Sequence, residues 1–159
     1  MTPMAINRHG TPEQKEKFLR GFAAGKLKSG FALTEPEGGS DAAGMRTHAE
    51  KRGNKWILNG RKHYISGGHV ADVIMVMAVT DPVKRARGGI TAFLLEKGMP
   101  GFEVTRVDTT IATDAIKLAE LTFTDCELPE SAVVGEVGAG FKVAMKSLND
   151  GRLSVSCSC

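Results

Sequence analysis

The apolar residues near the start of the chain follow a helical spacing. In the stretch "TPEQKEKFLRGFAAGKL" one apolar face is preceded by capping residues and followed by a glycine. A proline at the first helical position and a glutamine at the capping-box position strengthen the prediction of a helix. The apolar stripe consists of Phe18, Leu19 and Phe22, and the start and stop signals are Thr11, Pro12, Gln14 and Gly25.

The middle of the chain, about residues 29 to 134, has a strand pattern. Apolar or alternating runs are separated by turn residues, with no helical pattern between them. The runs are "FALT", "KWILNGRKHYIS", "DVIMVMAV", "ITAFLLE", "FEVTRV" and "ELTFTDCEL". Within the second run, Asn59-Gly60 predicts a hairpin turn. Such closely spaced strands favour a mainly β protein, an antiparallel barrel or sandwich, over parallel units with crossover helices.

A helical spacing returns from Gly138 onwards. Phe141, Met145 and Leu148 share one face, and Val155 continues it. We therefore predict a second helix at the end of the chain. Because the apolar pattern is still running at residue 159, we expect the sequence to be part of a longer protein.

Composition and charge limit the classes of function. The 159 residues are 42% hydrophobic and 25% charged, which is typical of one globular domain. A net charge of +3 does not indicate a nucleic-acid or membrane-surface partner. The basic run Lys84-Arg85-Ala86-Arg87 is consistent with a solvated loop or with a position near an anionic ligand. The sequence has neither a window of about 18 apolar residues nor the apolar core of a secretory signal.

Cysteine and histidine do not indicate a metal site or a disulfide framework. Their spacing matches no zinc motif and no set of paired cysteines. A reducing compartment is the default for such a chain, so we expect a cytoplasmic or mitochondrial-matrix protein. The residues concerned are Cys126, Cys157, Cys159, His9, His48, His63 and His69.

The stretch "FALTEPEGGSD" is the strongest candidate for a binding site. Gly38 and Gly39 allow backbone N–H groups to approach a ligand closely, and Thr34 and Ser40 add hydroxyl groups. The stretch lacks the glycine pattern of a Rossmann fingerprint, the Lys of a Walker A loop and the spacing of a nucleophile elbow. The two carboxylates, Glu35 and Asp41, are better explained as hydrogen-bonding props than as an acid and base pair. These residues alone leave a plain turn and a nucleotide-binding corner both open.

The residues from Ala32 to Gly44 resemble a long family signature, A-[LIVM]-T-E-P-x-x-G-S-D-x-x-G, which opens the middle β-barrel domain of the acyl-CoA dehydrogenases. "WILNGRKHYISGGHVADVIMVMAVTDP", "GGITAFLLEKGMPGF" and "ELTFTDCELPESAVVGEVGAGFKVAMKSLNDGR" resemble later parts of the same family. The resemblance extends from Gly10 to Arg152. It implies an antiparallel β-barrel of about seven to eight strands with a short helix at each end. The implied boundaries are 1–28 for the tail of an N-terminal helical domain, 29–135 for the barrel and 136–159 for the start of a C-terminal helical domain.

The resemblance also implies a site for FAD and acyl-CoA. Thr34 would bond to the edge of the flavin ring, Ser66 would lie near the flavin nitrogen that accepts hydride, and Ser40 would also contact the pantetheine of CoA. Asn149 and Arg152 would approach CoA from the last helix. The full set implied for the cofactor is Phe31, Ala32, Leu33, Thr34, Gly39, Ser40, Tyr64, Ile65 and Ser66, and for the substrate Ser40, Asn149 and Arg152.

Three positions depart from the family pattern. Tyr64 replaces the usual Trp beside the flavin, Gly67 replaces Asn, and Asp114 stands near the usual arginine. The catalytic glutamate of most members lies beyond residue 159. In a minority of members it directly precedes the arginine matched by Arg152, a position that is Gly151 here. The resemblance thus provides no catalytic base in this chain.

For the full-length protein, the resemblance implies α,β-desaturation of an acyl-CoA thioester. Hydride would pass to FAD and electrons to an electron-transfer flavoprotein, and the protein would be a homotetramer. The fragment itself would be inactive. The alternatives are an acyl-CoA oxidase, a flavin monooxygenase relative, or a non-catalytic barrel that binds flavin or CoA.

Overall fold

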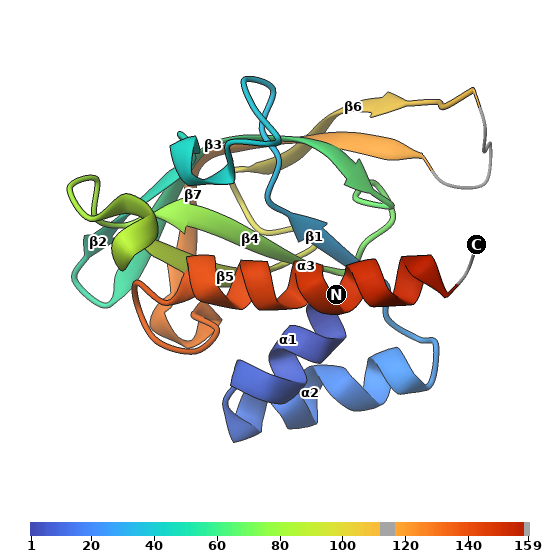
Figure 1. The fold of residues 1–159 in the computed structure, drawn as a ribbon. Coiled ribbons are helices and arrows are strands. Elements are labelled where there is room, and N and C mark those ends of the chain that lie inside the picture. Colours follow the sequence, from blue (N-terminus) through green and yellow to red (C-terminus); the bar gives the residue numbers. More distant parts are fainter. Residues whose placement is uncertain (112–116, 158–159) are drawn as a thin grey trace.

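The computed structural model describes residues 1–111 and 117–157, in which a curled sheet is covered on one side by helices (Figure 1). The helices are α1 (Thr2–His9), α2 (Pro12–Ala23) and α3 (Gly140–Ser156), with short 3-10 turns η1 (Ala42–Gly44), η2 (Arg85–Arg87) and η3 (Glu130–Ala132). The strands are β1 (Ser29–Ala32), β2 (His48–Arg52), β3 (Lys55–Ser66), β4 (Val73–Val79), β5 (Ile90–Glu96), β6 (Phe102–Asp108) and β7 (Leu118–Pro129). The prediction of a mainly β fold is confirmed.

The sheet is mixed, whereas the sequence predicted an antiparallel one. Its order is β1-β4-β2-β3-β7-β6, and β5 pairs with the other edge of β4. The pairs β2·β3, β3·β7, β4·β5 and β6·β7 are antiparallel, but β1 runs parallel to β4, and β2 meets β4 in parallel at one residue pair. A parallel pair cannot be closed by a tight hairpin. Here the chain makes the β2·β3 hairpin between β1 and β4, a long connection that local turn signals do not reveal.

Strand β4 is buried on both of its faces, which explains its unbroken apolar sequence "VIMVMAV". Ile74, Val76 and Ala78 point into the core inside the curled sheet. The alternate residues, represented by Met75 and Met77, belong to a second core between the sheet and the helices. All three helices contribute to this second core, and α3 packs on β4 and β5 (Figure 1).

The predicted hairpin at Asn59-Gly60 is wrong, because β3 runs through these residues without turning. Gly60 has a φ of +137° and lies at a bulge in the pairing with β7. The Asn59 amide donates to the Asp125 carboxylate at 3.1 Å and accepts from the Asp125 backbone N–H at 2.8 Å, which ties the bulge to β7. The true turn lies earlier, at Gly53, between β2 and β3.

The capping signals of α2 are confirmed. The Thr11 hydroxyl accepts from the Gln14 backbone N–H at 3.2 Å, and the Gln14 side chain accepts from the Thr11 N–H at 3.1 Å. The Gln14 amide also donates to the carbonyl oxygens of Ser131 and Val133, each at 2.8 Å. The sequence-based reading missed α1, a short helix whose Thr2 hydroxyl donates to the Gly30 carbonyl at 2.7 Å.

Candidate functional site

Two segments distant in sequence line one cavity of about 310 Å³. One segment comprises β1 and the residues after it, the other the end of β3. Helix α1 and the residue Leu148 of α3 close the remaining sides. The lining residues are Met1, Thr2, Ser29, Gly30, Phe31, Leu33, Thr34, Tyr64, Ile65, Ser66 and Leu148.

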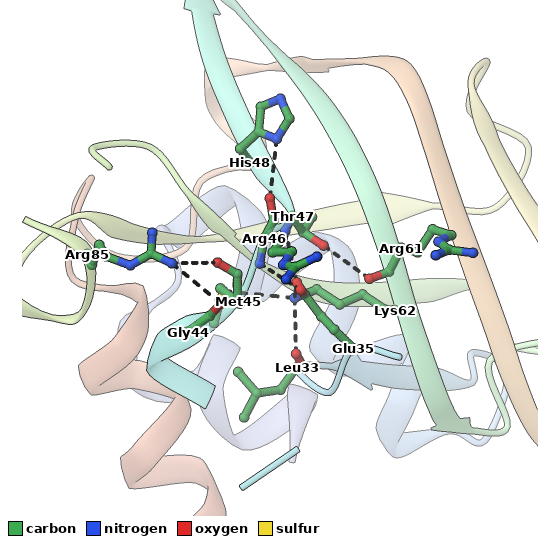
Figure 2. Close-up of polar contacts among 10 residues, drawn as sticks. All are labelled: Leu33, Glu35, Gly44, Met45, Arg46, Thr47, His48, Arg61, Lys62 and Arg85. Atoms are coloured by element: carbon green, nitrogen blue, oxygen red, sulfur yellow. Dashed lines mark hydrogen bonds and ion pairs between the residues drawn. The ribbon is translucent and has the colours of Figure 1, made fainter. Parts of the chain in front are cut away.

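The corner after β1 is fixed by a buried ion pair (Figure 2). Lys62 of β3 donates through Nζ to Glu35 Oε1 at 2.8 Å and to the Leu33 carbonyl at 3.0 Å. The Glu35 carboxylate also accepts from the backbone N–H of Arg46 at 2.6 Å and of Thr47 at 3.0 Å. Glu35 thus acts as the structural prop that the sequence indicated, and Lys62 is the partner that it did not reveal.

Burial governs the ionisation of this pair. The side chains of Lys62 and Glu35 are 0% and 4% exposed. Loss of hydration lowers the pKa of Lys62 to about 8, although the negative charge of Glu35 acts in the opposite direction. Burial also opposes the ionised form of Glu35, but Lys62 and the N–H of Arg46 together hold the pKa of that carboxyl below its usual range. The charged Lys62–Glu35 pair therefore holds the corner after β1 against β3, beside the cavity.

Tyr64 is presented to the cavity by an irregularity of β3. The pairing of β3 with β7 shifts between Lys62 and Ile65, and Tyr64 has a φ of +56°. Bulges of this kind re-aim side chains and occur next to active sites. The result is a tyrosine side chain that is 59% exposed, next to Ile65, which is buried.

The hydroxyl groups of Thr34 and Ser66 lie on the two lining segments of the same cavity. The Thr34 carbonyl is occupied, since it accepts from the His63 backbone N–H at 2.9 Å. Among the residues that the structure describes, neither hydroxyl has a side-chain hydrogen bond. Both are available to a ligand as donors or acceptors.

The other residues suggested by the sequence lie outside this cavity. Ala32 is fully buried in the core inside the sheet. Gly39 and Ser40 are exposed in the loop that follows the corner, beside a smaller cavity of about 170 Å³ lined by Glu35, Glu37, Gly38, Asp41, Gly44, Met45 and Arg46. Asn149 is exposed on α3.

Arg152 lines a separate open groove of about 920 Å³ between α1 and α3. This groove shares Met1 and Leu148 with the main cavity, so the two hollows adjoin. Asp114 lies outside the described residues. Over residues 1–111 and 117–157, no helix is long and apolar enough to cross a membrane, and no three metal-ligating side chains are grouped.

Sequence reasoning missed several residues that shape the cavity. Lys62 had no visible signal, because a lysine in an alternating strand is normally solvent-exposed. The role of Lys62 becomes recognisable only when the Glu35 corner is placed beside it. Met1 and Thr2 were missed because the helix that carries them was missed.

Comparison with known proteins gives consistent matches. Residues 30–126 match the family description "Acyl-CoA dehydrogenase, middle domain". Acryloyl-CoA reductase (NADH) of Anaerotignum propionicum is 41% identical over 157 residues, or 98% of this chain and 40% of that protein. The short-chain-specific acyl-CoA dehydrogenase of Clostridium acetobutylicum is 39% identical over 151 residues, or 95% of this chain and 40% of that protein. The chain thus spans about 40% of the length of these curated relatives.

Solved structures agree with this assignment. Butyryl-CoA dehydrogenase from Megasphaera elsdenii superposes with a TM-score of 0.93 at 41% identity, over 96% of this chain and 40% of that chain. A chain of the structure reported for the electron transferring flavoprotein of Acidaminococcus fermentans gives 0.93 at 43% identity, with the same coverage. A glutaryl-CoA dehydrogenase from Mycobacterium smegmatis, in complex with FADH2, gives 0.87 at 38% identity, over 96% and 38% of the two chains. Sequence motif, fold and relatives concur, and the chain belongs to the acyl-CoA dehydrogenase family.

Proposed function

We propose that the cavity between β1 and the end of β3 binds the flavin of FAD, and that the chain is the FAD- and acyl-CoA-binding part of an acyl-CoA dehydrogenase. The observation that carries this proposal is the meeting of Phe31, Leu33 and Thr34 with Tyr64 and Ser66 around one cavity. These are the two segments for which the family resemblance implies flavin contacts. Nothing in the spacing of residues 31–34 and 64–66 requires them to meet, since some thirty residues separate them.

The lining suits a flat heteroaromatic group. Phe31 and Tyr64 offer apolar or aromatic surface, whereas Thr34 and Ser66 offer hydroxyl groups towards a polar ring edge. The volume lies at the lower end of the usual range of ligand pockets, about 300–1,000 Å³. When bound, FAD would supply a hydride acceptor, and hydroxyl donors at the ring edge would stabilise the charge that it gains.

The proposal extends to the protein of which this chain forms part. Residues 29–135 would be its β-barrel domain, with residues 1–28 and 136–159 belonging to the flanking helical domains. The whole protein would desaturate an acyl-CoA thioester, assemble as a homotetramer and pass electrons to an electron-transfer flavoprotein. Ser40, Asn149 and Arg152 would contact CoA. Bacterial and mitochondrial relatives both occur, which supports a cytoplasmic or a mitochondrial-matrix location.

Replacing Ser66 with alanine is expected to weaken FAD binding by roughly threefold to tenfold, the usual effect of losing one hydrogen bond. The quenching of flavin fluorescence during titration of the chain measures this affinity. Ser131→Ala, which removes an exposed hydroxyl at η3 outside the cavity, is the matched control and should bind FAD as the parent chain does. A folded parent chain that leaves flavin fluorescence unchanged would refute the flavin site.

The chain alone is expected to show no dehydrogenase turnover. Gly151 occupies the position at which a minority of the family carries the catalytic glutamate, and no other residue has been assigned as the base. The measurement is reduction of a dye acceptor in the presence of FAD and a range of acyl-CoA thioesters. Turnover that follows the concentration of the purified chain would contradict this prediction and require a base within the 159 residues.

A further inference from the structure

His63, the residue before Tyr64, is buried at 5% exposure and bonded through its ring to two other strands. Its Nδ1 lies 2.8 Å from Glu120 Oε2 of β7, and its Nε2 lies 3.0 Å from an Nη atom of Arg106 of β6. An arginine can only donate, so Nε2 accepts, and the ring proton lies on Nδ1 and is donated to Glu120. The arrangement therefore holds a neutral imidazole in one tautomer.

The His63 ring is in direct contact with the Tyr64 ring. The ring centroids are 3.9 Å apart and the planes meet at 79°. Tyr64 has a left-handed backbone conformation, which a residue other than glycine keeps only where its surroundings impose it. The surroundings on the buried side are the His63 ring and the backbone bond from His63 to the Thr34 carbonyl, 2.9 Å long. One residue thus links both lining segments of the cavity.

The charges around His63 make its protonation state important. Glu120 from β7, Arg106 and Asp108 from β6, and Tyr64 from β3 itself are the titratable side chains in contact with the ring. Burial opposes the ionised form of Glu120, but the hydrogen bond from His63 and the charge of Arg106 hold the pKa of that carboxyl below its usual range. A second proton on His63 would remove the acceptor for Arg106 and turn Nε2 towards Asp108 Oδ2, now 3.6 Å away.

We propose that His63 is a positioning residue for the flavin site: its neutral ring, fixed by Glu120 and Arg106, sets the orientation of Tyr64 at the cavity wall, and its protonation shifts that orientation. The effect on FAD binding rests on the proposed FAD site. The coupling between the rings of His63 and Tyr64 is independent of that site. His63 acts through Tyr64 and does not itself line the cavity.

The chain contains a single tyrosine, so the NMR signals of a ring-labelled tyrosine report on Tyr64 alone. We expect these signals to move with pH along the titration of His63, which is followed in the same sample from its own ring signals. His63→Phe keeps a ring against Tyr64 but cannot titrate, and should abolish this movement. His48→Phe, which replaces an exposed histidine on β2, is the matched control and should leave the movement unchanged.

Flavin titration of the same proteins tests the functional consequence. His63→Phe should weaken FAD binding by roughly threefold to tenfold. His63→Gln, which retains one donor and one acceptor, should recover part of this loss and keeps the test informative if the phenylalanine variant does not fold. His48→Phe should bind FAD as the parent chain does.

The outcomes separate the two proposals. If the NMR signals of Tyr64 do not move as His63 titrates, the coupling between the two rings is overturned, whatever the affinity for FAD. If the Tyr64 signals do follow the titration of His63, but the parent chain and both His63 variants bind FAD equally well, the positioning role is overturned and the flavin site is retained. Coupled signals in a parent chain that binds no FAD would overturn the flavin site and, with it, the role assigned to His63 there.

Discussion

Replacement of Lys62 with methionine is expected to lower the free energy of unfolding at neutral pH by about 3–5 kcal/mol, the usual result of removing one partner of a buried ion pair. Methionine preserves most of the volume but leaves the Glu35 carboxylate buried with only two backbone donors, from Arg46 and Thr47. It also removes the hydrogen bond to the Leu33 carbonyl. Urea-induced unfolding followed by circular dichroism measures the effect.

The destabilisation should diminish as the pH falls. In the parent chain the folded-state pKa of Glu35 is depressed, so the stability that this group contributes is present above its usual pKa and disappears as the pH drops through the lowered value. Without Lys62, burial dominates and the folded-state pKa of Glu35 rises above its unfolded value. The variant is then penalised mainly at neutral pH, and protonation of Glu35 in acid removes the penalty.

Two further variants distinguish the buried pair from a general charge effect. Lys55→Met breaks an exposed pair with Glu127, whose side chains are 52% and 58% exposed, and should change stability by no more than about 1 kcal/mol. Adding Glu35→Gln to Lys62→Met should restore part of the loss, because it removes the unpaired buried charge, while the single glutamine oxygen still accepts from one of the two backbone N–H groups of Arg46 and Thr47. If Lys62→Met lowers the free energy of unfolding by no more than Lys55→Met does, the stabilising role of the buried Lys62–Glu35 pair is contradicted.

Replacement of Gly140 with alanine is expected to destabilise the chain by about 1–3 kcal/mol. Gly140 begins α3 where this helix lies against β5, and a Cβ there would be 2.4 Å from the carbonyl carbon of Thr91 and 2.5 Å from the nitrogen of Ala92. Both are backbone atoms of β5, which cannot give way as a flexible side chain could, so the helix must move. Since Leu148 of α3 closes the cavity, this shift should also reduce FAD affinity. Thermal unfolding and flavin titration measure the two effects.

Gly151→Ala on the same helix is the control, because it should leave stability unchanged or raise it, whereas Gly140→Ala should lower it. Its Cβ would meet only the flexible side chain of Met1, at 3.3 Å. Alanine is favoured over glycine in a helix interior by about 1 kcal/mol, so this variant should be as stable as the parent chain or slightly more stable. Equal destabilisation by Gly140→Ala and Gly151→Ala would show that close approach to β5 is not the cause.

Local signals in the sequence predicted the local structure well. The capping box of Thr11 and Gln14, the helical stripe after Gly138 and most strands were readable because each depends on residues only a few positions apart. The turn predicted from Asn59-Gly60 was wrong because the structure there depends on a residue far away in the sequence. Asn59 finds its partner in Asp125, 66 positions later, and this long-range bond favours a continuous strand over a turn.

The candidate site was predictable only in part. The family resemblance indicated Thr34 through the signature and Ser66 through a later segment, and the structure brings both to one cavity. The roles of Lys62 and His63 were not readable, because a buried lysine or histidine looks like a solvated one until its partners are placed. In both cases the partners, Glu35 and Glu120, come from segments separated by many residues.

The side chain of Gln14 joins parts of the chain that the expected boundaries assign to different domains. It completes the start of α2 by accepting from the Thr11 N–H, and it also donates to the carbonyl oxygens of Ser131 in η3 and of Val133 just after η3. The outer face of β4 lies in a core to which α1, α2 and α3 all contribute. The helical segments therefore share a core with the sheet, and we expect them to unfold together with it, so that a cut at residue 28 would remove part of a core and not merely detach a neighbouring module.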